Sequence, residues 1–330
     1  METPEKNRGN LSLEKGIFAF LLILAMAAPA LYSVKNFGQK LSAASLLAKT
    51  NKQETSNSWL PVKKENAGAP ELSSLSYLSA FIGNVGEVKI LAEKNAYDQL
   101  PIASVTKLMT AMVAADSLDM EQIITMDSRN ILKEEGSKRF NAGTKFKAKE
   151  LLHAMLVESN NDAAAAFMEE VGKTKFIEQM NLKAKQLNLL STYFNNPVGL
   201  DPKDIRDELN YSTAADLLAI AKEVKENYPQ ILEITSLPEY NVHNSDGWFN
   251  HVAVSTDKLL ASNELACDGA PLKILGGKTG STDLAKKNLV LITGSPNPEG
   301  YLINIVLSSD DNFEDTKKLA RWMCESYQWR

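Results

Sequence analysis

The stretch PIASVTKLMT, residues 101–110, places a serine and a lysine three positions apart at the start of an apolar, alanine-rich run. Residues at i and i+3 share one face of a helix, and proline suits the entry of a helix rather than its interior. The pattern therefore predicts a helix over about 104–117, with Ser104 in its first turn and the Lys107 amine within reach of the Ser104 oxygen. At that end of a helix, backbone N–H groups and the positive end of the dipole would stabilise an oxyanion.

Serine is a poor nucleophile at neutral pH and needs a base beside it. Lysine can be that base only when it is neutral, so its pKa must fall from about 10.4 through burial or a second positive charge nearby. The spacing alone carries little weight, because Ser-x-x-Lys also begins at Ser12 and at Ser255. A second cation therefore decides whether Ser104 and Lys107 form a catalytic pair or an ordinary helix start with an exposed lysine.

Two further stretches carry polar groups that helices and strands do not need for folding. ESNND at 158–162 precedes an alanine-rich run, and its Ser159 and Asn161 could point into one cleft, although the stretch would also serve as an N-cap. GGKTGST at 276–282 puts Lys278 beside a strand, where glycine lets another backbone or a ligand approach closely. A glycine-rich turn with a solvated lysine is the alternative. Lys278 is the candidate second cation, and three weak signals in a fixed order favour a single site.

Strand signals occur towards both ends of the chain, and helical periodicity lies between them. The expected strands are 77–82, 87–91, 272–275, 287–293 and 301–307. The expected helices are 104–117, 148–158, 162–171, 174–188, 212–226 and 312–327. One antiparallel sheet is therefore built from both chain ends around an inserted helical subdomain, which predicts an α+β fold.

Composition and charge exclude several classes of function. The chain has 330 residues, 44% of them hydrophobic, a net charge of -5 and a pI near 5.5. It can bury a good-sized core, and it has no dense basic block, so no nucleic acid partner is predicted. The three histidines lack His-Glu-x-x-His spacing and two cysteines fall short of a zinc pattern, so no metal and no cofactor are predicted. Separately buried thiols at Cys267 and Cys324 are favoured over a bridge between them.

The N-terminal region has the features of a targeting segment. Residues 16–34 contain no charge, which is near the lower limit for a membrane span, and APA at 28–30 has the form of a signal cleavage site. A retained single-pass anchor in the cell membrane is favoured over a cleaved signal. In both cases the remainder is exported. The expected organisation is an anchor or signal peptide at 1–35, a flexible linker at 36–70 and an extracytoplasmic catalytic domain at 71–330.

The chain resembles the low-molecular-weight penicillin-binding proteins that act as serine-type D-Ala-D-Ala carboxypeptidases. The stretches that carry the resemblance are ASVTKLMT at 103–110, SNNDA at 159–163, NNPVGLD at 195–201 and GKTGST at 277–282. The resemblance covers about residues 75–328. It implies a β-lactamase/transpeptidase-like fold, removal of the terminal D-alanine from peptidoglycan stem peptides, and covalent inhibition by β-lactam antibiotics.

The resemblance also implies a role for each candidate residue. Ser104 would be the nucleophile, Lys107 its base and Ser159 the proton relay to the leaving D-alanine. Backbone N–H groups of Ser104 and Ser281 would form the oxyanion hole, a device worth about 3 kcal/mol per donor. Asn161 would hold the acyl-side amide, Lys278 would supply positive charge and Thr279 would help to hold the terminal carboxylate. The set expected to bind substrate is Asn161, Lys278, Thr279, Gly280 and Ser281.

Four other functions stay open. A D,D-endopeptidase acting on cross-links would use the same residues. A class A β-lactamase adds a deacylating glutamate, but RDELN at 206–210 has Arg206 at the corresponding position. A wall-binding or scaffolding protein would have lost turnover, although all the expected side chains are present. A Ser-His-Asp hydrolase would need a histidine near the serine. His153 is expected in or beside a helical core, and His243 and His251 in a polar surface loop, so none is predicted to be needed for activity.

Overall fold

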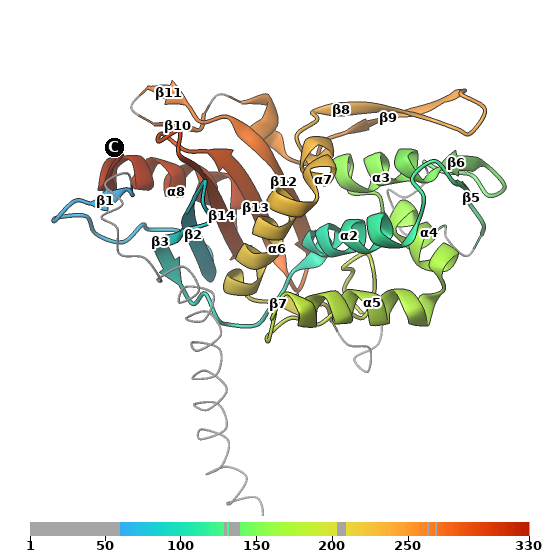
Figure 1. Ribbon diagram of the computed structural model, residues 1–330, viewed down its shortest axis with the longest axis horizontal. Coiled ribbons are helices and arrows are strands. Elements are labelled where there is room, and N and C mark those ends of the chain that lie inside the picture. The colour runs from blue at the N-terminus through green and yellow to red at the C-terminus, as the bar shows by residue number, and fades with distance from the viewer. Residues whose placement is uncertain are drawn as a thin grey trace, which may run out of the picture. The chain divides into compact units, whose positions relative to one another are not determined.

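The centre of the fold is a five-stranded antiparallel sheet with strand order β12-β13-β14-β2-β3 (Figure 1). The computed structural model describes residues 60–128, 131, 139–202, 209–262, 264–267 and 269–329. The strands are β2 (Ser76–Gly83), β3 (Val88–Lys94), β12 (Ile274–Thr282), β13 (Lys286–Gly294) and β14 (Gly300–Ser309). Because β2 pairs with β14, strands from early and late parts of the chain share one sheet. The predicted α+β class is confirmed.

Both faces of the sheet are covered by helices. Side chains alternate between the faces of a strand, so Leu289 and Leu291 of β13 join a cluster with Met323 of α8 (Asn312–Ser326). Val290, between them, joins the larger cluster on the opposite face. Figure 1 shows α8 on one side of the sheet and α6 (Ala214–Asn227) on the other. Covering both faces explains why β2 is buried along its whole length.

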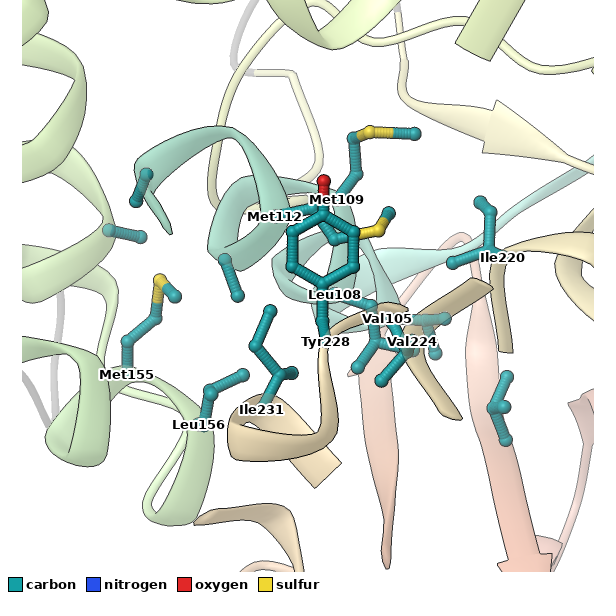
Figure 2. Packing of buried hydrophobic residues seen from close by; sticks show 14 of the residues in the cluster. Val105, Leu108, Met109, Met112, Met155, Leu156, Ile220, Val224, Tyr228 and Ile231 are labelled. Carbon is teal, nitrogen blue, oxygen red and sulfur yellow. The ribbon is translucent and has the colours of Figure 1, made fainter. Parts of the chain in front are cut away.

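The second part of the core lies among the helices between β3 and β12. Side chains from several helices meet around Met109 and Met112 of α2, including Met155, Val224 and Ile231 (Figure 2). This packing fixes α2 beside the sheet. The remaining helical elements are η1 (Ala103–Thr106), α2 (Lys107–Ser117), α3 (Ala148–Val157), α4 (Asn161–Val171), α5 (Lys173–Gln186), α7 (Pro229–Thr235) and η2 (Lys258–Ala261).

Short strand pairs complete the described part of the chain. They are β1 (Val62–Lys63) with β15 (Tyr327–Gln328), β4 (Leu100–Pro101) with β7 (Tyr211–Ser212), β5 (Ile123–Thr125) with β6 (Lys145–Lys147), β8 (Glu239–His243) with β9 (Phe249–Val254), and β10 (Ala266–Cys267) with β11 (Ala270–Pro271). The β8–β9 hairpin extends over the helical part, next to α3 and α7 (Figure 1).

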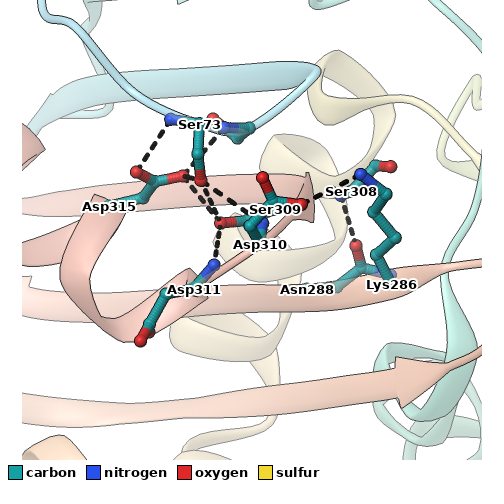
Figure 3. A network of polar contacts seen from close by, with 9 residues as sticks. Ser73, Lys286, Asn288, Ser308, Ser309, Asp310, Asp311 and Asp315 are labelled. Carbon is teal, nitrogen blue, oxygen red and sulfur yellow. Dashed lines mark hydrogen bonds and ion pairs between the residues drawn. The ribbon is translucent and has the colours of Figure 1, made fainter.

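A polar network ties the segment before β2 to the start of α8 (Figure 3). The Asp315 carboxylate accepts hydrogen bonds from the backbone N–H and the hydroxyl of Ser73, at 3.0 and 2.8 Å, and from the hydroxyl of Ser309 at 2.6 Å. Burial alone would raise the pKa of Asp315, but the hydrogen bonds from Ser309 and Ser73 hold that pKa below its usual value. The charged carboxylate therefore joins β14, α8 and the segment that leads into β2.

The predicted helices agree with the structure to within two residues, whereas the strands agree less well. The strand predicted at 87–91 ends three residues before the end of β3. The predicted strand 272–275 is much shorter than β12, which runs on through the glycine-rich motif that local propensity disfavours. The β8–β9 hairpin was not predicted. Along β8 only Val242 is buried, so the alternation that marks a half-buried strand is weak.

Three further expectations have structural outcomes. Cys267 and Cys324 form a disulfide, so the favoured prediction of separate thiols is wrong, because sequence spacing does not reveal that β10 packs beside α8. His243 and His251 lie in the strands of the hairpin rather than in a surface loop, and His251 is buried. Residues 62–63, inside the expected linker, form β1. Within the described ranges, no helix is long and apolar enough to cross a membrane, and the apolar run 16–34 lies outside them.

Candidate active site

Ser104 and Lys107 lie where the chain passes from η1 into α2. Ala103 has a φ of 47°, which turns the chain sharply before Ser104. Lys107 has no exposed surface, and its Nζ donates a hydrogen bond to the Ser104 Oγ at 2.8 Å. Most lysine side chains project into water. The complete burial of Lys107 beside a hydroxyl therefore excludes the alternative of an ordinary helix start with an exposed lysine.

Two further oxygens surround the Lys107 amine. Its Nζ lies 2.7 Å from the Asn161 Oδ1 and 3.0 Å from the Val198 carbonyl oxygen. Val198 belongs to the NNPVGLD stretch, where Gly199 has a φ of 82° and a Cβ would lie 1.9 Å from the Ala103 carbonyl oxygen. Only glycine fits there without displacing the turn before Ser104. This stretch therefore sets both the position of η1 and an acceptor for Lys107.

Ser159 stands on the turn between α3 and α4, opposite Lys278 of β12. Its φ of 62° lies in the left-handed region, which is unusual for a residue other than glycine, so the backbone at Ser159 is not helical. Lys278 is 1% exposed, and its Nζ donates to the Ser159 Oγ at 2.9 Å and to the Thr279 carbonyl oxygen at 3.1 Å. Burial lowers the pKa of Lys278 to about 7, although the negative charge of Asp257 acts in the opposite direction.

The outer strand β12 passes directly beside η1. A Cβ on Gly280 would lie 3.1 Å from the Ser104 backbone nitrogen, so the two segments are in close contact and the next residue, Ser281, is brought beside Ser104. Thr279 is half-buried, and its hydroxyl lies 2.6 Å from the hydroxyl of Thr256. The structure thus brings together all eight residues that the sequence analysis selected.

A cavity of about 340 Å³ opens over these residues. Lys107 and Lys278 reach it through the hydroxyls that they contact. The residues that line it are Ser104, Ser159, Thr256, Thr279, Gly280, Ser281, Lys287, Asn312 and Phe313. Sequence reasoning missed four of them. Lys287 could have been found, because the hairpin pairing of β12 with β13 places it opposite Ser281. Thr256, Asn312 and Phe313 arrive through tertiary packing, and no local pattern in the sequence marks them.

The histidines do not supply a base to Ser104 in the contacts described. The His153 Nδ1 contacts the backbone oxygen of Lys149, its ring stacks on Tyr240, and burial lowers its pKa. The His251 ring contacts Asn250 and Glu158. A Ser-His-Asp arrangement therefore finds no geometric support in the described residues. Residues 203–208, which include the Arg206 that argued against a class A β-lactamase, lie outside them.

Known proteins share this sequence pattern and fold. A family model described as D-alanyl-D-alanine carboxypeptidase, peptidase family S11, matches residues 64–311. D-alanyl-D-alanine carboxypeptidase DacF of Bacillus subtilis is 34% identical over 180 residues, 52% of this chain and 44% of that protein, so the match spans less than half of that relative. D-alanyl-D-alanine endopeptidase of Pseudomonas aeruginosa is 28% identical over 262 residues, which cover 78% of this chain and 80% of that protein.

A solved structure shows the same fold. Penicillin-binding protein D2 of Listeria monocytogenes, in its ampicillin-bound form, superposes with a TM-score of 0.64 at 26% identity, covering 78% of this chain and 99% of that one. The predicted β-lactamase/transpeptidase-like architecture is therefore confirmed.

Proposed function

We propose that this chain, which belongs to the D-alanyl-D-alanine carboxypeptidase family, removes the terminal D-alanine from peptidoglycan stem peptides through an acyl-enzyme on Ser104. The observation that carries this proposal is the buried amine of Lys107, 2.8 Å from the Ser104 hydroxyl. A neutral amine has two N–H donors and one lone pair. It can donate to Asn161 and Val198 while accepting the Ser104 proton, which is the arrangement that a general base requires.

Acylation then follows from the geometry. The Ser104 Oγ attacks the carbonyl carbon of the penultimate D-alanine and its proton passes to Lys107. Backbone N–H groups of Ser104 and Ser281, brought together by the contact at Gly280, stabilise the oxyanion. The peptide C–N bond breaks, and Ser159, hydrogen-bonded to Lys278, passes its hydroxyl proton to the departing amine. The proton that Lys107 took from Ser104 then replaces it on Ser159, so the net transfer is from Ser104 to the leaving D-alanine. Water hydrolyses the ester and frees Ser104.

The substrate's terminal carboxylate would bind at the side of the cavity formed by β12. Lys278 lies beneath that side, Thr279 and Thr256 offer hydroxyls, and Lys287 adds an exposed ammonium to the cavity wall. Asn161 would bind the acyl-side amide with the donors of its side chain, since its Oδ1 is occupied by Lys107. Cations and hydroxyls bind a carboxylate through charge-assisted hydrogen bonds, and this supports a leaving D-alanine that carries a free C-terminus.

Cleavage of D-alanyl cross-links is the second candidate. The Pseudomonas aeruginosa relative that matches along most of both chains carries the name D-alanyl-D-alanine endopeptidase. Lys287, on the cavity wall, is exposed to solvent, so a substituted leaving group could extend past it. An assay that offers cross-linked and uncross-linked muropeptides together, with product masses followed in time, separates the two activities.

Intact mass after penicillin treatment tests the central proposal. The parent chain should gain one drug-sized increment, because β-lactams acylate the same serine, and Ser104→Ala should gain none. Ser255→Ala is the matched control, since Ser255 also precedes a lysine by three positions. It should be labelled like the parent. An unlabelled parent, or a labelled Ser104→Ala, would refute the proposal.

The N-terminal segment would hold the catalytic domain outside the cytoplasm at the cell membrane. The charge-free run at 16–34 supports this placement, with Lys15 and Arg8 on its cytoplasmic side. Fractionation of cells that express the full chain tests it. Recovery in the membrane at full length supports a retained anchor, recovery of a shortened exported form supports a signal peptide, and recovery in the cytosol contradicts both.

A further inference from the structure

Glu158, the residue directly before Ser159, has a largely buried carboxylate that does not line the cavity. The Glu158 side chain is 12% exposed. Its Oε1 accepts a hydrogen bond from the Asn160 Nδ2 at 2.8 Å and lies 3.0 Å from the His251 Nε2, while its Oε2 lies 4.0 Å from the Arg139 Nε. A shielded carboxylate is tolerated only when it is paired. Glu158 therefore has a defined place behind the turn, supported by a neighbour in sequence and by a distant strand.

The position of His251 is fixed by its burial and by contacts on both of its ring nitrogens. It lies on β9, is buried, and its ring meets the edge of Phe140 at a centroid distance of 5.5 Å. Its Nδ1 lies 2.6 Å from the Asn250 Oδ1, so both ring nitrogens face oxygen atoms. The contact with Glu158 is thus a short, oriented link between β9 and the turn.

The same link continues into helix α4. The Asn160 side chain donates to Glu158 and, through its Oδ1, accepts from the Ala163 N–H at 2.9 Å, which caps α4. Ser159 and Asn161 lie immediately before and after Asn160, and they contact the two lysine amines of the site. A chain of side-chain contacts therefore runs from β9 through Glu158 to the residue between Ser159 and Asn161.

The hairpin also touches β12 through the loop that follows β9. The Thr256 N–H donates to the Val157 carbonyl oxygen at 3.1 Å, and the Thr256 hydroxyl meets that of Thr279. The segment after β9 is thereby fixed to β12 and to the last residue of α3, directly before the turn. A shift of the turn relative to β9 would separate Ser159 from Lys278, because these residues come from the two sides that the hairpin joins.

We propose that Glu158 is a positioning residue for acyl transfer, and that His251 acts through it to hold the turn with Ser159 and Asn161 against the two lysines. The left-handed backbone at Ser159 costs free energy, and the Glu158 contacts compensate for it. This inference rests on the proposed function, since it concerns the rate at which Ser104 is acylated. It assigns the β8–β9 hairpin a role as the rear support of the site.

A double-mutant cycle on the full chain tests the proposal, with the second-order rate constant of penicillin acylation as the readout. Glu158→Ala should slow acylation by about tenfold to a hundredfold, because a small misplacement of reacting groups is costly. His251→Ala should slow it in the same direction, which departs from the sequence-based prediction that no histidine is needed for activity and follows from the contact of His251 with Glu158. The double variant should be no slower than Glu158→Ala alone, because both changes break one link. Glu158→Gln should recover most of the rate, since its amide oxygen can accept from Asn160 and His251.

His153→Ala is the matched control. It also removes a shielded histidine that contacts the hairpin, through a ring stack on Tyr240 at 3.9 Å, but it leaves Glu158 untouched. It should acylate at the parent rate. An unchanged rate in Glu158→Ala, multiplying effects in the double variant, or an equal loss in His153→Ala would overturn the proposal. Should Glu158→Ala fail to fold, the acylation rates of His251→Ala and His153→Ala test the proposal without it. Their melting temperatures are measured as well, so that a loss of rate is not mistaken for a loss of stability.

The two proposals fail in different ways. Every variant of the cycle should still reach one drug-sized adduct at long times, because Ser104 and Lys107 are unchanged. A parent chain without any adduct would refute the acyl-enzyme itself. A labelled parent whose rate is insensitive to Glu158 would refute only the positioning role.

Discussion

Gly280 and Ile102 are in such close contact that a Cβ on Gly280 would lie 2.7 Å from the Ile102 carbonyl oxygen. The contact brings β12 against η1 and aligns the backbone N–H groups proposed for the oxyanion. Real Cβ atoms do not approach that closely, so Gly280→Ala must push the two segments apart. We expect penicillin acylation to fall by about a hundredfold, measured as the second-order rate constant. Gly294→Ala, where the nearest atom is 3.8 Å away, is the matched glycine control in the neighbouring strand and should acylate normally.

Replacement of Lys107 separates its charge from its basicity. Lys107→Ala should lower the acylation rate by about 10²- to 10⁴-fold, the usual contribution of a positioned base. Lys107→Arg should not restore it, because a guanidinium stays protonated and cannot accept the Ser104 proton. Both rates are measured by stopped-flow or quenched mass analysis, with circular dichroism to confirm folding. Restoration by arginine would show that positive charge, rather than a base, is what Ser104 needs.

The pH dependence of kcat/KM should report on Lys278. Burial lowers the pKa of this amine to about 7, and Asp257 opposes the shift. Because the amine is charged only below its pKa, substrate capture through Lys278 should weaken as the pH rises through about 7. Asp257→Asn removes the opposing charge, lowers the pKa of Lys278 further and should move the alkaline limb to lower pH.

Asp310→Asn is the control for that titration, since Asp310 is exposed and pairs with Lys286 at 3.0 Å. Its profile on a D-Ala-D-Ala peptide should match that of the parent. An Asp257→Asn profile that stays in place, or moves to higher pH, would contradict the assigned cause of the shift.

Lys287 should contribute to binding of the free carboxylate rather than to chemistry. Lys287→Ala is expected to raise KM for a D-Ala-D-Ala peptide by about two- to fivefold, as for a solvent-exposed ion pair, with kcat nearly unchanged. The effect should vanish for a peptide whose C-terminus is amidated. Lys286→Ala, one residue away and outside the cavity, should leave both constants alone. An equal KM effect on the amidated peptide would assign Lys287 a different role.

The disulfide should affect stability and leave the chemistry unchanged. Cys267 and Cys324 are 57 positions apart and lie in the cluster between the sheet and α8, on the face opposite the helical core. Closing a loop of that length stabilises a fold by about 4 kcal/mol in the chain-entropy description. The Cys267→Ala/Cys324→Ala variant should unfold at lower urea concentration, measured with the unreduced parent as reference, yet acylate at the parental rate. Equal unfolding midpoints would show that the bond adds nothing measurable.

Much of the fold follows from local pattern, because helical periodicity marks a buried face directly. The start predicted at residue 104 falls in η1, which begins at Ala103 and leads into α2 at Lys107, and the start predicted at 162 is one residue after that of α4. The β12 strand was harder to predict, since Gly276, Gly277 and Gly280 weaken its strand signal. Those glycines are present because backbone or side-chain atoms approach them closely, which is a tertiary requirement.

The site shows the same division between local and tertiary information. Ser104 and Lys107 could be paired from spacing alone, because one helical turn joins them. Lys278 was selected from its glycine-rich segment as the candidate second cation, but its contact with Ser159 spans 119 positions and was not predicted. Glu158 was not predicted because a glutamate in a polar stretch is typical of an exposed residue. His251 was not predicted because only the folding of the hairpin brings its imidazole to Glu158.

The strand order of the central sheet also bears on when this protein can fold. Ser79 of β2 bonds to Asn304 of β14, 225 positions later in the chain. A nascent chain that has reached α7 already contains Ser104, Lys107 and Ser159, yet β2 still lacks its partner and its apolar side chains lack the cover of α8. The central sheet can therefore form only when translation of the domain is nearly finished. Until then the growing polypeptide exposes apolar side chains and needs protection from aggregation, such as a chaperone provides.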